Sequence, residues 1–308
     1  MSSPFACGVM ALPLVAFLSV RFEFLSYRDN SYLTCKKSEN KMASNLLTQM
    51  GSATVRECFF QQEPAIEKQN ASVVELDFYQ HHAPVLRAQG LGIPDVYFLS
   101  QQERRLVIEF IPQYLTLEAL LAATELCEKL AIIHHSPPKP SGAFRQHSWS
   151  DEQTDLALSM LQLPTDQEAV LLSFRTCSDE LFEPQQRVSG DTNAGNWGRR
   201  AKGDLVLFDW ERFGYGSPAI DLAPLIKGMG DPASINQMVE RYRQAAPQWS
   251  VPVLVRHVVV AKAWLITEVL SILHHRHPQL LPKYLSWYRA TLPGWLPMAQ
   301  HLWAHPQG

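Results

Sequence analysis

The sequence has little of what marks disulfide-rich, zinc-binding and nucleic-acid-binding proteins. Its five cysteines are odd in number, scattered along the chain and never spaced as Cys-x-x-Cys. Reduced thiols are therefore expected in place of disulfides or zinc ligands. The formal net charge is −3, and without a basic excess no nucleic-acid partner is expected. These absences favour a globular cytoplasmic protein.

A convincing targeting or membrane segment is also missing. Residues 5–20 are mostly apolar, but Pro13 interrupts them and no Lys or Arg precedes them. A secretory signal normally starts with positive charge, and a spanning helix needs about twenty apolar residues. We interpret residues 1–41 as an irregular extension or as a misassigned start, with Met42 as the alternative start. A signal or anchor is the competing interpretation, and no membrane is expected.

A second apolar stretch, residues 253–275, is long enough to suggest a membrane span. It contains Arg256, Lys262 and Glu268, and charges distributed in this way favour a helix buried inside a helical lobe.

The chain has no glycine-rich phosphate loop. Two short turns are candidates for the turn that covers a nucleotide's phosphates. One is residues 26–30, between β-rich segments at 21–25 and 31–35, and the other is residues 51–54, before a strand predicted over 55–61. Neither has the glycine spacing of a known nucleotide-binding loop.

Two polar segments joined by a turn stand out in the second half of the chain. Asp191 and Asn196 lie five residues apart, and Asp209 follows an apolar run at 205–208. Residues 202–204, Lys-Gly-Asp, predict a turn because Gly accepts positive φ and Asp bonds its own backbone. The resulting hairpin would bring the three polar side chains into one small volume.

This combination of side chains suits phosphoryl transfer. An Asp can accept the proton of an attacking hydroxyl, and an Asn and a second Asp can hold magnesium, which prefers hard oxygen ligands. Protein kinases have the same skeleton, an Asp followed five residues later by an Asn, with a metal-binding Asp beyond a short hairpin.

Residues 190–196, Gly-Asp-x-x-x-x-Asn, resemble the catalytic loop of the aminoglycoside phosphotransferase and choline kinase superfamily, although Ser189 stands where that family usually has His. Residues 208–211, Phe-Asp-Trp-Glu, resemble its metal-binding segment. The pattern continues through Gly214, Gly216 and Pro218 to Asp221.

The resemblance implies an α+β, two-lobed protein-kinase-like fold, with a small antiparallel-sheet N-lobe and a larger helical C-lobe. It implies ATP and Mg2+ as cofactors, Asp191 as the catalytic residue, and Asn196 and Asp209 as metal ligands. Asp221 would brace the catalytic loop. We expect residues 42–110 to form the nucleotide-binding lobe and residues 111–308 to form the catalytic and acceptor-binding lobe.

The first lobe offers three further candidates for nucleotide binding. Glu75 lies in a predicted helix over 73–79 that resembles the family's Glu-x-x-Phe-Tyr pattern, and it would pair with a strand lysine. The usual sequence spacing places the expected strand lysine near Gln61. The nearest lysine, Lys68, looks too close to Glu75 in the sequence for the ordinary geometry of such a pair. The strand predicted over 105–112 resembles a kinase hinge, in which backbone groups of Glu109 and Ile111 would bond adenine.

Beyond the hinge, apolar periodicity predicts helices over 115–121, 125–135, 149–163, 167–177, 234–245 and 253–275. The acids Asp151, Glu152 and Asp155 either face a cationic substrate or belong to a solvated helix face. The aromatic residues of 284–303 either fill the core or line a cation–π pocket. His134 is expected to be structural.

The sequence therefore predicts an ATP-dependent phosphotransferase that moves the γ-phosphate to a hydroxyl of a small molecule, such as an amino alcohol, an aminoglycoside, thiamine or a sugar-like compound. The alternatives are a catalytically impaired nucleotide-binding pseudokinase and a kinase-fold nucleotidyl or protein-modifying transferase. Ser189 and the unplaced lysine motivate the first alternative.

Overall fold

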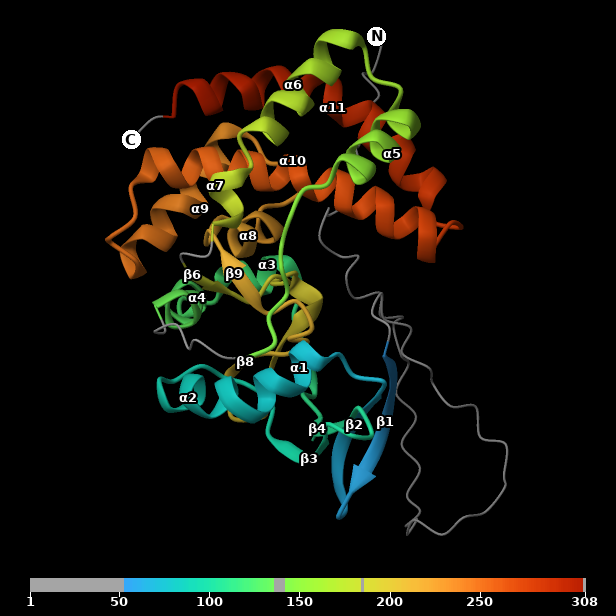
Figure 1. Ribbon diagram of the computed structural model, residues 1–308. Coiled ribbons are helices and arrows are strands. Elements are labelled where there is room, and N and C mark those ends of the chain that lie inside the picture. Colours follow the sequence, from blue (N-terminus) through green and yellow to red (C-terminus); the bar gives the residue numbers. More distant parts are fainter. Residues whose placement is uncertain (1–52, 136–141, 184–185, 307–308) are drawn as a thin grey trace, which may run out of the picture.

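The computed structural model describes residues 53–135, 142–183 and 186–306, which form a smaller lobe with a sheet and a larger helical lobe (Figure 1). The predicted extension at 1–41 and the predicted turn at 26–30 lie outside these residues, as do the first two residues of the turn at 51–54. The predicted division at residue 110 stays a prediction.

The smaller lobe has an antiparallel sheet in the order β1-β2-β4-β3. Its strands are β1 (Thr54–Phe60), β2 (Glu63–Gln69), β3 (Val96–Ser100) and β4 (Arg105–Glu109). Gln61 and Gln62 form the turn between β1 and β2 with φ of 50° and 75°, the left-handed values of the turns that join tightly paired strands. Sequence reasoning missed one strand, β2.

A segment of three helical pieces covers one side of this sheet. It consists of α1 (Val73–Asp77), a π-helical turn η1 (Phe78–His82) and α2 (Ala83–Ala88). Ser72 caps α1, because its Oγ accepts a hydrogen bond of 3.0 Å from the Glu75 N–H. The predicted helix over 73–79 is therefore present and longer than expected.

The larger lobe contains every helix predicted for it, with ends within two residues of the predicted ones. Its helices are α3 (Leu117–Ala122), α4 (Leu126–His135), α5 (Asp151–Leu161), α6 (Thr165–Thr176), α7 (Asp179–Phe182), α8 (Ala219–Leu222), α9 (Pro232–Ala245), α10 (Val251–Arg276) and α11 (Leu281–Ala304), with the short 3-10 turns η2 (Ala194–Asn196) and η3 (Ala223–Leu225). In Figure 1, α10 crosses the lobe, with α11, α5 and α9 around it.

Helix α10 is buried around most of its circumference, which explains its near-continuous apolar sequence. Among the described residues, none of the helices combines the length and apolarity that crossing a bilayer requires. The tail aromatics Tyr284, Tyr288 and Trp295 are buried in the same core. Core filling is thus the correct interpretation for these three.

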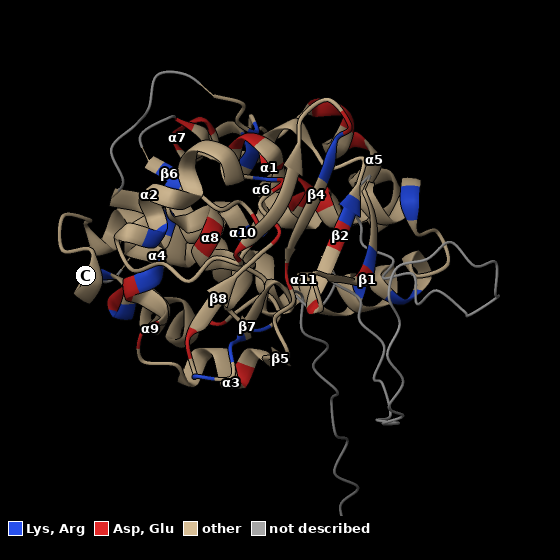
Figure 2. Cartoon of the chain, turned by 90° about the horizontal axis from the view of Figure 1, so that it is seen from below, with Lys and Arg blue, Asp and Glu red and all other residues tan. Residues whose placement is uncertain are grey.

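Small sheets at the junction carry the polar segments. Strands β5 (Gln113–Tyr114), β7 (Trp197–Arg199) and β8 (Leu205–Leu207) form one sheet, and β6 (Gln186–Val188) pairs with β9 (Gly214–Gly216). The predicted hairpin is confirmed as β7 and β8, with Gly203 at φ 96° in its turn. Acidic and basic residues are interspersed along the elements, without one dominant sign (Figure 2).

Candidate active site

The loop after β6 is fixed by the carboxylate of Asp221. That carboxylate accepts hydrogen bonds from the Ser189 N–H at 2.7 Å and the Gly190 N–H at 2.8 Å. A Cβ on Gly190 would lie 2.3 Å from the carbonyl oxygen of Arg212, and its φ is 77°, so only glycine fits here. Both bonds are donated by backbone N–H groups, so the side chain of Ser189 takes no part in them.

Asp221 is itself held by a buried polar chain. The Nε2 of His134 lies 3.1 Å from the Asp221 carboxylate, and its Nδ1 lies 2.6 Å from the Tyr242 hydroxyl. His134 and Asp221 are fully buried, and buried polar groups that are all bonded make a rigid support. The structure thus places His134 behind the loop and away from the reacting groups.

Asp191 is buried in the bend of this loop, with its carboxylate accepting a hydrogen bond from the Asn193 amide. Burial raises the pKa of Asp191 to about 7, which nearby Arg212 opposes and Asp209 reinforces. A carboxylate with a pKa near neutrality is well matched to accept a proton at physiological pH.

The hairpin places Asn196 and Asp209 beside this loop. The Asn196 amide donates to the backbone oxygen of Asp191 at 3.0 Å, and the Phe208 N–H donates to the backbone oxygen of Asn196 at 3.0 Å. Asp209 has a φ of 69°, an uncommon value for a non-glycine residue that is often found at functional sites. The three predicted residues are therefore neighbours.

The strand lysine is Lys68, on β2. Its ammonium group lies 2.6 Å from the Glu75 carboxylate and 2.8 Å from the Asp209 carboxylate, and all three side chains are buried. Burial alone would lower the pKa of Lys68, but the two carboxylates outweigh it and raise that pKa well above its usual value. The expectation that Lys68 lies too close in sequence to Glu75 is wrong.

A sharp turn explains how Lys68 and Glu75 can pair although they lie only seven residues apart in the sequence. Asn70 has a left-handed φ of 58°, and α1 starts at Val73, so that Glu75 lies in its first turn. The placement near Gln61 is wrong because that residue lies in the β1–β2 turn. One signal in the sequence could have located this lysine. Side chains alternate between the two faces of a strand, so Lys68 lies on the same face as buried Ile66.

The predicted hinge lines a narrow, mostly apolar cavity. Its walls include Ile66, Ile108, Ile111 and Phe208, with Lys68 and Asp209 at one end. The Glu109 N–H donates to the Asp95 carbonyl at 2.8 Å. The Ile111 N–H has no backbone acceptor within the described residues. An apolar slot that ends at a lysine and an aspartate suits a flat base followed by phosphates.

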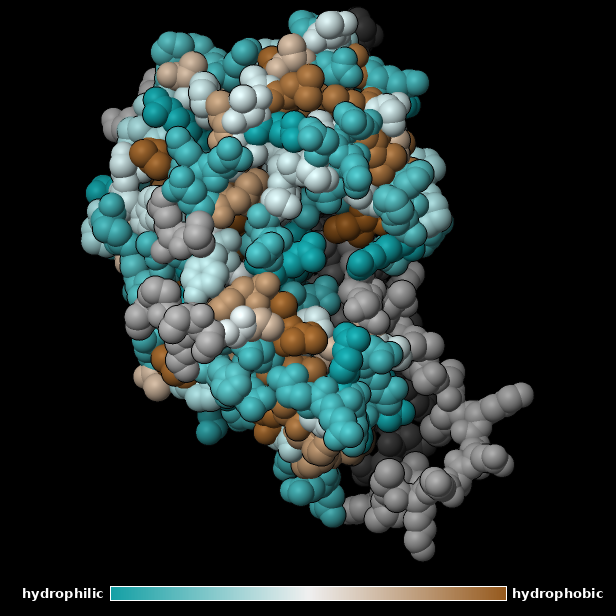
Figure 3. All heavy atoms as spheres, in the orientation of Figure 1, coloured by the Kyte–Doolittle hydropathy of each residue, from teal (hydrophilic) through white to brown (hydrophobic). Residues whose placement is uncertain are grey.

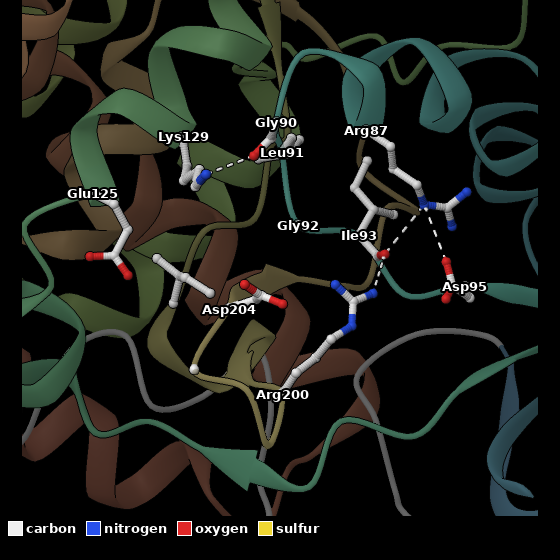
Figure 4. A pocket seen from close by; sticks show the side chains of 12 residues that line it. Arg87, Gly90, Leu91, Gly92, Ile93, Asp95, Glu125, Lys129, Arg200 and Asp204 are labelled. Atoms are coloured by element: carbon white, nitrogen blue, oxygen red, sulfur yellow. Dashed lines mark hydrogen bonds and ion pairs between the residues drawn. The ribbon is translucent and has the colours of Figure 1, made fainter.

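The side chain of Glu109 forms an ion pair with Arg200, one of the residues that line a second cavity (Figure 4). Arg200 holds its two carboxylate oxygens at 2.8 and 2.6 Å, and also donates to the Ile93 carbonyl at 2.9 Å. Figure 4 shows Arg87 converging on the same carbonyl, with Lys129 bonded to Gly90. These bonds tie the β7–β8 turn to the smaller lobe.

A polar cleft of about 380 Å3 lies between Ser72 in the smaller lobe and α5 and α10 in the larger one. Glu211 and Arg212 line it. Figure 3 shows hydrophilic side chains along the waist between the lobes. Asp209 lines the apolar slot, and Glu211, two residues further along the chain, lines the polar cleft.

Sequence comparison agrees with this geometry. The model of the phosphotransferase enzyme family matches residues 60–252, well over half of the chain. The chain belongs to this family. Membership confirms the family and the enzyme class predicted from the sequence, a phosphotransferase with an alcohol group as acceptor. Comparison with curated proteins finds no significant match.

Solved structures similar to this phosphotransferase share its fold. A choline/ethanolamine kinase family protein from Mesorhizobium loti has a TM-score of 0.57 at 17% identity, covering 82% of this chain and 88% of its own. The GDP and kanamycin complex of APH(2")-IIia has a TM-score of 0.57 at 12% identity, covering 82% and 92%. LicA in complex with AMP has a TM-score of 0.54 at 14% identity, covering 82% and 92%. The predicted fold class is thereby confirmed.

Proposed function

We propose that this phosphotransferase moves the γ-phosphate of ATP to a hydroxyl of a small molecule. The observation that carries the proposal is the position of Asp209, which pairs with Lys68, lines the apolar cavity and, through the β7–β8 hairpin, lies beside the loop of Asp191. The similarity to nucleotide complexes with AMP and GDP supports the apolar slot as the nucleotide site.

In this proposal the chain positions two reactants and moves one proton. Lys68 binds the phosphates, Glu75 orients Lys68, and backbone groups of Glu109 and Ile111 bind adenine. Asp191 accepts the proton of the acceptor hydroxyl as its oxygen attacks the γ-phosphorus. The bond to the β-phosphate oxygen breaks and ADP leaves.

The residues present fit Mg2+. Asn196 and Asp209 supply an amide oxygen and a carboxylate, which are the ligand types that Mg2+ prefers, and Mg2+ commonly takes one or two protein carboxylates with substrate phosphates and water. Within the described residues no group of three or more His, Cys, Asp or Glu side chains is arranged to hold a metal alone. A metal bound there together with the nucleotide would neutralise phosphate charge.

The finding of Lys68 removes one of the two reasons for a pseudokinase. The other reason was Ser189, whose backbone N–H makes the same kind of bond to Asp221 as that of Gly190. No observation favours nucleotidyl transfer over phosphoryl transfer.

The substitution Asp191→Asn tests the proposal. It removes the proton acceptor while keeping the side-chain shape, so acceptor-dependent ADP release should fall by about 10²–10⁴-fold, with an unchanged thermal unfolding midpoint. The control is Asp204→Asn, at an exposed aspartate in the β7–β8 turn, which should keep full activity. Unchanged turnover in Asp191→Asn contradicts the assigned role, and release of pyrophosphate in place of ADP indicates nucleotidyl transfer.

A further inference from the structure

The polar cleft next to Glu211 is the place where an acceptor has to lie if the apolar slot holds the nucleotide. It opens between Ser72 at the start of α1, Gln153 on α5 and the last turns of α10. Its lining therefore indicates the chemistry of the acceptor. The following inference rests on the proposed function and specifies the class of acceptor.

Among the described residues, no aromatic side chain lines this cleft, and Ile272 is its only aliphatic one. A pocket for a quaternary ammonium group normally presents aromatic faces to the cation. The tail aromatics that were candidates for such a pocket are not part of the cleft.

The acidic residues proposed for a cationic substrate are also absent from the cleft. Asp151, Glu152 and Asp155 do not line it, and Asp151 pairs with Arg175 at 2.5 Å. From that helix only Gln153 lines the cleft. A solvated helix face is thus the interpretation that the structure favours for these acids.

Basic side chains outnumber acidic ones around the cleft. Arg212 forms a buried ion pair with Glu268 and its Nε donates to the Gly190 carbonyl at 3.1 Å, so these two charges cancel and serve the catalytic loop. Arg145, Arg276 and Glu211 carry the remaining formal charges. Their sum is +1, and His275 can only add to it.

These charges are separated along the cleft. Glu211 is two residues from Asp209, at the end where phosphates and metal are proposed to bind. His275 and Arg276 lie at the carboxyl end of α10, where Nδ1 of His275 is bonded to the Ser271 carbonyl at 2.8 Å. The end of the cleft away from the proposed phosphate site is therefore cationic.

Arg145 is the basic residue best placed to bind a ligand. Its side chain is exposed and, within the described part of the chain, forms no hydrogen bond or ion pair. Its backbone is fixed, because the Arg145 N–H donates to the Phe213 carbonyl at 2.8 Å and the residue bridges to Gly214. The guanidinium thus extends from a segment attached to the strand that follows Asp209, Glu211 and Arg212.

We propose that the acceptor is an alcohol bearing an anionic group, a carboxylate or a phosphate, and that the guanidinium of Arg145 binds this group. A planar guanidinium can bind either anion through two parallel hydrogen bonds. The anion is held by Arg145, and the hydroxyl of the same acceptor reaches Asp191.

A panel of matched acceptors tests this inference on the full chain with ATP and Mg2+. The pairs are glycerol with glycerol 2-phosphate and glucitol with gluconate, and ethanolamine and choline represent the amines. ADP release is followed at constant free Mg2+, and calorimetry measures acceptor binding in the presence of ADP. The acidic member of at least one pair should have a kcat/KM at least about ten times that of its neutral partner, since hydrogen bonds between ionised groups are the strong ones.

Variants of Arg145 then separate binding from folding. Arg145→Met should raise the KM for the acidic acceptor by about 10–100-fold, leaving kcat and the KM for ATP unchanged, because a lost charged hydrogen bond costs about 1.5–3 kcal/mol. Arg145→Lys should restore part of the affinity. Arg243→Met, at an exposed arginine of α9 that pairs with Glu240, is the matched control and should have no effect.

The outcomes distinguish this inference from the proposed function. Turnover of amines without turnover or binding of any acidic acceptor overturns the inference and leaves the phosphotransferase proposal standing. Equal effects of Arg145→Met on acidic and neutral acceptors also overturn it. If ATP binds but no acceptor of any kind reacts, the proposed function fails together with the inference.

Discussion

Two buried lysines, one in each lobe, show how different partners give the same side chain opposite properties. Lys68 on β2 lies between two carboxylates, and its pKa is raised well above the usual value despite complete burial. Lys262 on α10 bonds only the backbone carbonyls of Ile226 and Gly228, at 2.6 and 2.7 Å, and burial lowers its pKa to about 7.

The two lysines differ in role: Lys68 belongs to the candidate active site, whereas Lys262 supports the fold. A buried charge is stabilised when opposite charges surround it, whereas carbonyl dipoles alone offset only part of its desolvation. Lys68 stays charged at any physiological pH and can hold phosphates. Lys262 holds the segment after η3 in place. It is not among the residues that line the apolar slot or the polar cleft. Three features of the comparison can be tested, beginning with the largest expected effect.

Replacing Lys68 should affect catalysis far more than replacing Lys262. Lys68→Met removes the donor proposed for the phosphates and leaves Glu75 and Asp209 without their cation, so kcat/KM for ATP should fall by about 10²–10³-fold. Lys262→Met should keep kcat/KM within about threefold, in keeping with a role in the fold alone. Steady-state kinetics of both purified variants measure these losses in kcat/KM. Comparable losses in the two variants would contradict the different roles assigned to the two lysines.

Lys262 should make stability depend on pH. Above pH 7 the folded protein loses the Lys262 proton, whereas the unfolded chain keeps it up to its ordinary pKa, so the unfolded state binds more protons and stability rises with pH. The expected gain is about 1.4 kcal/mol per pH unit above pH 7, relative to Lys262→Met. Urea unfolding of both proteins at pH 6, 7, 8 and 9 measures it. A difference between them that does not change with pH contradicts the prediction.

Removing one of the two carboxylates around Lys68 should have a smaller effect. Glu75→Gln keeps a hydrogen-bond acceptor beside Lys68 but removes one negative charge, so Lys68 remains charged through Asp209 and is less firmly oriented. We expect about a tenfold loss in kcat/KM for ATP, the equivalent of about 1.4 kcal/mol. Glu57→Gln, at an exposed residue of β1, is the matched control. A loss as large as that of Lys68→Met would show that orientation matters as much as the charge.

The catalytic half of the site was predictable because its geometry is local. Asp191, Asn196 and Asp209 lie within nineteen residues of one another, and a turn at Gly203 is enough to bring them together. Asp221 was also anticipated, since it follows on the same short stretch. Residues joined by a short stretch of chain cannot lie far apart in space. The pattern of residue types in this stretch was therefore enough to predict that their side chains meet.

The nucleotide half was predicted less well because it depends on a turn that the sequence signals weakly. Asn70 in a left-handed conformation brings Lys68 to Glu75, and β2 was not recognised as a strand. The lining of the proposed acceptor cleft was left open for a similar reason. Arg145, Gln153 and Arg276 belong to three segments whose approach depends on how α5 and α10 pack, and acidic residues on one helix face gave no measure of that packing.

The amino-acid sequence by itself determined the helices of the larger lobe, the β7–β8 hairpin and the set of candidate oxygen ligands, because helix periodicity, turn residues and short chain connections act over a few residues. The tertiary structure decided which buried lysine lies between carboxylates, which histidine stands behind the loop and which charges line the acceptor cleft. These depend on contacts such as that of Lys68 with Asp209, 141 residues apart in the chain, and burial then sets the charge state of each group.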